Sequence, residues 1–201
     1  MCKLAKVLAV MLMSIGTIAV APLAAQANTT AYGTESGGVF KAFTTATKVM
    51  STGSAFFVSG PAGMIEFTTC TDTGTLENIG GVGHSSETIK CSGGVFVSGP
   101  LAGCKVANTF GEVTDEVQPG GVTVRVTVVS GFELDTTGKP AGCPTDMLGN
   151  VTSSVTGHQA PGSNVLVFES ATGLTFLGEP ATLSGSEETV TKTEGDPVVI
   201  N

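Results

Sequence analysis

Side chains capable of acid–base or nucleophilic chemistry are scarce in this chain, which has two histidines among its 201 residues. His84 stands beside Ser85 and Ser86, but neighbours in sequence do not make a catalytic triad, and no G-x-S-x-G turn presents a serine nucleophile. His158 lies in the loop-like stretch TGHQAPG and is predicted to be solvated. No serine or histidine is therefore predicted to be catalytic.

The segment Asp72-Thr73-Gly74-Thr75 matches the D-T-G-[ST] motif in which a carboxyl pair shares a proton and activates water, as in aspartic proteases. Two such loops must meet, and the nearest second candidate, Asp135-Thr136-Thr137-Gly138, carries an extra threonine. Cys70 and Thr71 also stand where those enzymes have apolar residues. We therefore expect the segment to be a turn between strands, where Asp, Thr and Gly are common.

The other acidic residues are predicted to be ordinary positions on strands or loops. Asp115-Glu116 and Glu187-Glu188 could hold calcium, but no loop has the D-x-[DN]-x-[DN]-G pattern, so solvated charge is the expected use. Trp is absent and Tyr32 is the only Tyr, which removes the usual stacking platforms for sugars and nucleic-acid bases. No catalytic, cofactor-binding or metal-binding residue is predicted, and no glycosidase pair is assigned among Glu66, Glu112, Asp115, Glu116, Glu133 and Asp135.

Four cysteines remain beyond the N-terminal segment that contains Cys2. An even number in an exported chain predicts two disulfides, whereas zinc, the competing use, lacks a C-x-x-C pair here. Three pairings are possible. We favour Cys70–Cys104, because both residues lie at the ends of expected strands, and Cys91–Cys143 follows by elimination.

Residues 1–27 have the pattern of a secretory signal peptide. Lys3 and Lys6 precede an apolar run, and Ala25-Gln26-Ala27 is an A-x-A cleavage site. An uncleaved anchor is the alternative, since Val7 to Ala25 is nearly long enough to span a bilayer. We expect cleavage after Ala27, a single secreted β-domain over residues 28–201, a secreted or cell-surface location, and no membrane span after cleavage.

The composition of residues 28–201 restricts the partners. Removing two of the nine basic residues leaves seven against 17 acidic ones, a formal charge of −10. Nucleic acid and anionic membranes are therefore not expected as partners. Over the whole chain only 13% of residues are charged and 28 are Gly, which favours a packed β-domain over disorder.

Period-two alternation indicates strands, most clearly in residues 121–128, where four valines alternate with Thr123, Arg125 and Thr127. Helical periodicity is absent after the signal. Many short strands separated by Gly, Pro, Asn and Ser clusters predict an all-β, antiparallel β-sandwich or barrel-like domain. The other expected strands are 38–45, 54–59, 64–70, 87–92, 94–98, 104–110, 165–170, 174–177 and 197–201.

The phrase FVSGP occurs twice, at residues 57–61 and 96–100. In each copy a strand-like run leads into Gly and Pro, which favour turns. An internal duplication is possible, but similarity fades outside the phrase. We interpret both copies as strand ends running into hairpin turns rather than as a binding motif.

The segment AGMIEFTTCTDTGTL (residues 62–76) and the closing Pro197-Val-Val-Ile-Asn201 resemble uncharacterised secreted β-proteins of actinobacteria. The resemblance implies secretion and a β-fold and carries no activity or site residue. We expect a non-catalytic extracellular β-domain without a cofactor, with a protein or cell-surface partner possible. The alternatives are a pilin-like subunit that receives a strand in trans and a secreted hydrolase with an unidentified site.

Overall fold

A computed structural model describes residues 30–60, 62–106, 109–130, 133–134, 136–137, 143 and 149–201. The proposed signal peptide lies outside these residues. All regular structure in the described part is β-strand, and the antiparallel all-β prediction is confirmed.

Among the residues described, no helix is long and apolar enough to cross a membrane.

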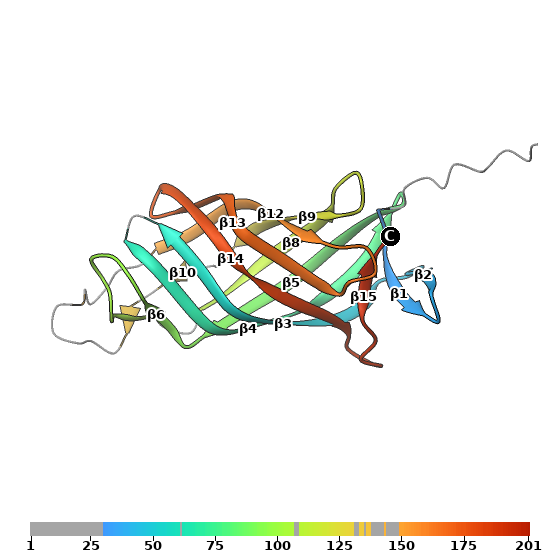
Figure 1. The fold of residues 1–201 in the computed structure, drawn as a ribbon, viewed down its shortest axis with the longest axis horizontal. Coiled ribbons are helices and arrows are strands. Elements are labelled where there is room, and N and C mark those ends of the chain that lie inside the picture. Colours follow the sequence, from blue (N-terminus) through green and yellow to red (C-terminus); the bar gives the residue numbers. More distant parts are fainter. Residues whose placement is uncertain are drawn as a thin grey trace, which may run out of the picture.

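Eight long strands form a closed antiparallel barrel (Figure 1), in which each strand pairs with the next one along the ring. The ring closes where the last of these strands, β14, pairs with the first, β3, from Thr182↔Ser59 to Thr191↔Val49. Closure leaves the ring without a free edge and selects the barrel over the sandwich. The strands are β3 (Thr47–Gly60), β4 (Gly63–Ile79), β5 (Val82–Ser92), β8 (Thr109–Val117), β9 (Thr123–Ser130), β12 (Gly149–Gln159), β13 (Val165–Phe176) and β14 (Glu179–Thr191).

Short strands extend the sheet at one end of the barrel, on the left in Figure 1. β6 (Gly94–Phe96) pairs with β4, and β7 (Lys105–Val106) pairs with β6. β11 (Thr136–Thr137) pairs with β7, and β10 (Glu133–Leu134) pairs with β12.

A separate three-stranded sheet lies at the opposite end of the barrel (Figure 1) and has the order β15-β1-β2. Its members are β1 (Tyr32–Ser36), β2 (Val39–Ala42) and β15 (Val198–Ile200). The side chains of Tyr32, Val198 and Ile200 are buried in the core of the barrel. We call this sheet the end plug.

Hydrogen bonds fix the end plug in place. The Asn78 side chain accepts a bond from Tyr32 N at 2.8 Å and donates to Tyr32 O and Phe43 O, both at 2.9 Å. Within the plug, the two ends of the described chain pair with each other, since Ala31 N donates to Asn201 O and Asn201 N donates to Ala31 O, each at 3.2 Å.

The two FVSGP phrases lie at neighbouring strand ends, as their interpretation requires, and Pro61 lies outside the described residues. Residues 57–60 end β3, with Gly60 opposite Gly63, and the second phrase begins at Phe96, the last residue of β6. Gly63 and Gly99 both have positive φ, and a methyl group added to Gly99 would lie 2.5 Å from the Gly63 Cα. Val97 N also donates to Met64 O at 2.8 Å. The repeated phrase thus produces two turns packed against each other.

Several sequence-based expectations differ from the structure. Asp72–Thr75 is not a turn but the middle of β4, and His158 lies in β12 rather than in a loop. β8, β12 and β14 include segments that were not among the expected strands. β12 and β14 are rich in Thr, Ser, Gly and Glu, so apolar alternation along them is weak.

Candidate functional site

The barrel interior contains a cavity of about 70 Å³, to which seven of the eight barrel strands contribute. Its lining combines an apolar wall, a pair of bridged cysteines and three carboxyl groups. Space of this size holds several waters or a small molecule. The lining residues are Val58, Phe67, Cys70, Asp72, Ile89, Cys91, Val113, Asp115, Val126, Phe168, Leu183 and Glu187.

Strand alternation places acidic residues among apolar ones on the inner face. In β8, Asp115 stands between the buried Val113 and Val117, and in β4, Asp72 stands two residues after the buried Cys70. Successive side chains of a strand point to opposite faces, so residues two apart share a face. The acids therefore point inward because of their position along the strand.

Two further carboxyl groups complete this acidic cluster, namely Glu87 on β5 and Glu187 on β14. Glu87 is buried, and Gly74 on the neighbouring strand makes room for it, since a methyl group added there would lie 2.7 Å from the Glu87 Cγ. Glu187 is half-buried and lies opposite Gly53 of β3.

The four carboxyl groups lie in two close pairs. Asp72 and Glu187 shift each other's pKa, and so do Glu87 and Asp115. The Ser85 hydroxyl accepts a bond from Asp115 N at 3.0 Å and lies close enough to Glu87 and Asp115 to favour their ionised forms, against the larger effect of burial. Two carboxyl groups can hydrogen-bond to each other only when at least one is protonated, so a direct bond within either pair requires a proton.

One oxygen of each aspartate has no hydrogen-bond partner. These atoms are Asp72 Oδ1 and Asp115 Oδ1. Asp72 is 4% exposed and Asp115 is 8% exposed. Buried polar atoms are almost always satisfied, and an unsatisfied one costs roughly 1–3 kcal/mol. Both residues line the cavity, so each presents an unused acceptor next to open space.

Burial shifts the ionisation of all four acids in one direction. Removal from water raises the pKa of Asp72 to about 7, with the charges of Glu87 and Asp115 adding to the effect. It also raises the pKa of Glu87, and raises the pKa values of Asp115 and Glu187 well above their ordinary range. The desolvation penalty on a buried carboxylate is the dominant cause in each case.

No described cation compensates these acids. Every Lys and Arg side chain within the described ranges is exposed, and Arg125 pairs with Glu116 on the outside of the barrel at 3.2 Å. The phenol of the buried Tyr32 is close enough for the charges of Asp115 and Glu87 to raise its pKa, after burial itself. The interior is therefore an acidic environment without a counter-ion from the described chain.

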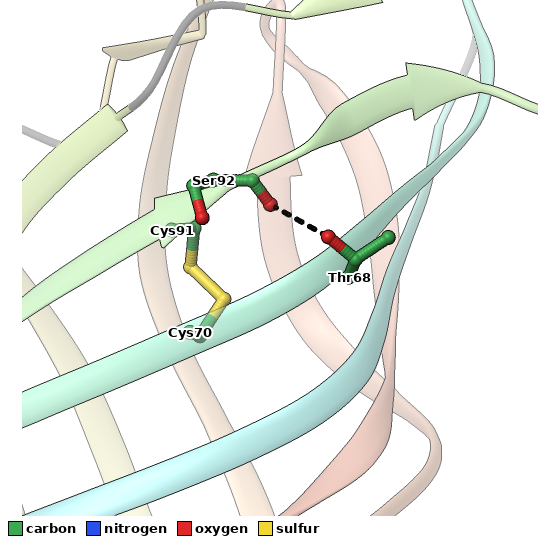
Figure 2. The surroundings of a disulfide bond; sticks show 4 residues. All are labelled: Thr68, Cys70, Cys91 and Ser92. Carbon is green, nitrogen blue, oxygen red and sulfur yellow. Dashed lines mark hydrogen bonds between the residues drawn. A yellow bond between two sulfur atoms is a disulfide. The ribbon is translucent and has the colours of Figure 1, made fainter.

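The disulfides correct the predicted pairing. Cys70 is bonded to Cys91, and Cys104 to Cys143, instead of Cys70 to Cys104 and Cys91 to Cys143. Cys70 and Cys91 lie directly opposite each other on β4 and β5, with Cα atoms 4.1 Å apart. Figure 2 shows this cross-strand bridge beside the hydrogen bond from Thr68 Oγ1 to Ser92 O, at 3.4 Å. The register of β4 and β5, rather than the similarity of the two FVSGP turns, determines which cysteines are bonded.

The cavity also corrects the interpretation of the acidic residues. Asp115 and Glu187 were expected to carry solvated charge, yet Asp115 is buried and both line the cavity. Asp72 was singled out for its motif and assigned to a turn, whereas it is a buried residue of the barrel interior. Glu87 was missed altogether. Glu133 has no described side chain and Asp135 lies outside the described residues.

The described histidines and carboxyl groups do not assemble into the sites considered from the sequence. His84 is half-buried, and His158 is exposed on β12 and belongs to the outer surface. In the described part of the chain, no group of three His, Cys, Asp or Glu side chains is arranged to hold a metal ion.

Comparison of the chain with protein-family models, with curated proteins and with solved structures finds no match. The geometry of the cavity is therefore the only basis, among the described residues, for proposing a function.

Proposed function

We propose that this protein is a non-catalytic extracellular β-barrel that binds a small molecule in its interior. The observation that carries the proposal is the cavity whose apolar wall surrounds two aspartate oxygens without partners. An eight-stranded barrel is just wide enough inside to be filled by side chains or to hold one small ligand. A mostly apolar pocket with a few convergent polar groups is the usual form of such a binding site.

Binding explains the cavity better than hydrolysis does. The Asp72–Glu187 carboxyl pair is the arrangement closest to acid–base catalysis. A cavity of about 70 Å³ inside a closed ring, however, has no room for a polypeptide or a sugar chain beside that pair. Neither described histidine lies in the cavity lining, so the hydrolase alternative gains no base or nucleophile there.

The location outside the cytoplasm rests on two independent features. The first 27 residues carry the signal-peptide pattern, and the barrel contains two disulfides, which persist in oxidising compartments. Mass spectrometry of the exported protein is expected to find Asn28 as the first residue. A mature form that retains residues 1–27 in the membrane would contradict export as a soluble domain.

The pilin-like alternative requires a groove left by a missing strand. The barrel ring is continuous, since β14 pairs with β3 and β4 pairs with β5. No position for an incoming strand is open in the described ring, so the binding proposal is preferred.

Interior binding is tested with 1-pentanol, a small uncharged probe with an apolar chain. We expect saturable binding by isothermal titration calorimetry, lost in Val126→Phe, because Val126 lines the cavity. Val129→Phe on the same strand is the matched control, since Val129 is 56% exposed. Leu183→Phe serves as the second cavity variant if Val126→Phe does not fold.

Absence of pentanol binding to the native protein would contradict the proposal. Equal binding by the native protein and by a folded cavity variant would place the probe outside the barrel and contradict it as well.

A further inference from the structure

Building on the proposed function, we propose that the interior ligand is a small organic cation, with an ammonium group against Asp72 and Asp115 and a short apolar body against the surrounding wall. The existence of a cavity alone does not determine the chemical class of its ligand.

The unused acceptors define the position of the ammonium group. Asp72 Oδ1 and Asp115 Oδ1 are both buried, both lack a partner, and both belong to residues that line one cavity. An ammonium group carries only donors, and a primary one has three. It therefore supplies what both aspartates lack, whereas a carboxylate or phosphate would add acceptors and negative charge.

The charge balance of the interior favours the same class of ligand. Four carboxyl groups from four different strands converge without an inward-pointing described cation. Buried charges in proteins are normally paired. A bound cation would provide the missing partner.

A metal ion is a poorer match than an organic cation. No three acidic, His or Cys side chains among the described residues are arranged to coordinate one, and magnesium and calcium need six or more oxygen ligands. Most of the lining is apolar, with Val58, Phe67 and Leu183 on strands β3, β4 and β14. Such a wall matches a hydrocarbon body attached to the charged group.

The size of the cavity limits the ligand. One water requires on the order of 10–15 Å³ of this kind of volume, and the cavity has about 70 Å³. A ligand of about six non-hydrogen atoms is therefore expected. Pentylammonium meets this limit, and 1-pentanol and pentanoate are its neutral and anionic counterparts.

The acidic cluster makes binding depend on pH. The titratable groups facing the aspartates are Glu87 from β5, Glu187 from β14 and the phenol of Tyr32 from β1. The remaining barrel strands contribute residues such as Ser51, Val126, Val155 and Phe168 to the buried interior, none of them titratable. Because a bound cation favours the ionised carboxylates, binding near neutral pH should release protons, and affinity for pentylammonium should rise from pH 5 to pH 8.

The experiment compares the three probes by calorimetry at pH 7.5 on the chain beginning at residue 28. We expect pentylammonium to bind at least tenfold more tightly than 1-pentanol, and pentanoate not to bind. The variant Asp72→Asn/Asp115→Asn should lose at least tenfold more affinity for pentylammonium than for 1-pentanol. Glu77→Gln is the matched control, because Glu77 lies on β4 with its side chain exposed.

The outcomes separate this inference from the proposed function. Equal affinity for pentylammonium and 1-pentanol would overturn the cationic ligand and leave interior binding standing. Failure of all three probes would overturn both. If the double variant does not fold, affinity for pentylammonium is measured in the single variants instead. Proton release on binding is measured from calorimetry in two buffers of different ionisation enthalpy, and absence of proton release would also overturn the inference.

Discussion

Ionisation of the four interior acids lowers the stability of the barrel, because a carboxylate in the interior loses its contact with water. These acids are Asp72, Glu87, Asp115 and Glu187. The folded state therefore binds more protons than the unfolded state between the ordinary and the raised pKa values. By linkage, stability is fully present below the ordinary pKa of these groups and is lost as pH rises through the raised values.

The free energy of unfolding should accordingly fall from pH 5 to pH 8 in the absence of ligand. With the pKa of Asp72 raised to about 7, this residue alone contributes a decrease of about 2–3 kcal/mol over that interval. Urea titrations monitored by circular dichroism at both pH values measure the difference. Asp72→Asn should reduce the slope, and Glu77→Gln should leave it unchanged. A stability maximum at pH 8 would contradict the buried cluster.

The sequence indicates that some of the acids point inward, through the buried apolar residues that alternate with them along a strand. Asp115 stands in the alternating series Val113, Asp115, Val117, where the apolar neighbours mark the buried face. Reading acidic residues by strand phase instead of by residue type would have placed Asp115 inside. Asp72 shares the phase of the buried Cys70, but the buried Ile65 and Phe67 earlier in β4 have the opposite phase, so the alternation alone does not place it. Glu187 lies in a Ser- and Glu-rich stretch without such neighbours, and its position depends on the pairing of β14 with β3.

Single hairpins determine which distant residues meet. Gly80-Gly81 forms a two-residue turn between β4 and β5, with Ile79 opposite Val82. Counting outward from this turn brings Cys70 opposite Cys91. Gly-Gly is a typical two-residue hairpin sequence, so the correct bridge could have been derived from the sequence. The similarity of the FVSGP turns correctly indicated strand ends and gave no information about strand register.

Peptide mapping checks the bridges. Trypsin alone leaves Cys91 and Cys104 on one peptide, residues 91–105, so chymotrypsin must also cleave after Phe96. We expect one linked pair with Cys70 and Cys91 and another with Cys104 and Cys143. Replacing Cys70 and Cys91 by Ala should lower stability by about 3 kcal/mol. A Cys70–Cys104 peptide would contradict the strand register.

The contact between the twin turns predicts unequal effects of two similar substitutions. Gly99 and Gly103 both have positive φ, so Ala is strained at each, by about 1 kcal/mol. Only at Gly99 would the added methyl also collide with Gly63, whereas nothing lies within 4 Å at Gly103. Gly99→Ala should therefore lower the free energy of unfolding by at least about 1 kcal/mol more than Gly103→Ala. Equal losses in urea denaturation would show that the turns do not pack together.

At the scale of the whole molecule, the all-β class follows from the alternation of Val122 to Val128 and the many turn residues, and the structure confirms it. Closure into a barrel was not predictable in the same way, because it depends on pairing between β3 and β14, which are more than 120 residues apart. The end plug likewise depends on contacts between the two ends of the described chain.

Removal of the Asn78 side chain should release the end plug from the barrel. Its bonds to Tyr32 and Phe43 satisfy backbone groups that would otherwise be left unpaired. Asn78→Ala should lower the free energy of unfolding by about 3 kcal/mol and accelerate amide exchange of Tyr32. Asn164→Ala, which loses an exposed bond to Glu188, is the control and should change stability by less than about 0.5 kcal/mol. Comparable losses in both variants would contradict the anchoring role.

The reciprocal bonds between Ala31 and Asn201 hold the two ends of the described chain side by side. The ends can therefore be joined and the chain opened elsewhere without changing which strands pair. A short linker from residue 201 to residue 30 would span neighbouring ends, and new ends could open at the exposed Leu177-Gly178 turn, outside the plug and the cavity lining. Such a circular permutant retains every barrel pairing while β14 becomes the first strand of the chain. It should fold with native-like circular dichroism and retain binding of 1-pentanol, and the new ends would provide attachment points at a different site on the barrel from the original ones.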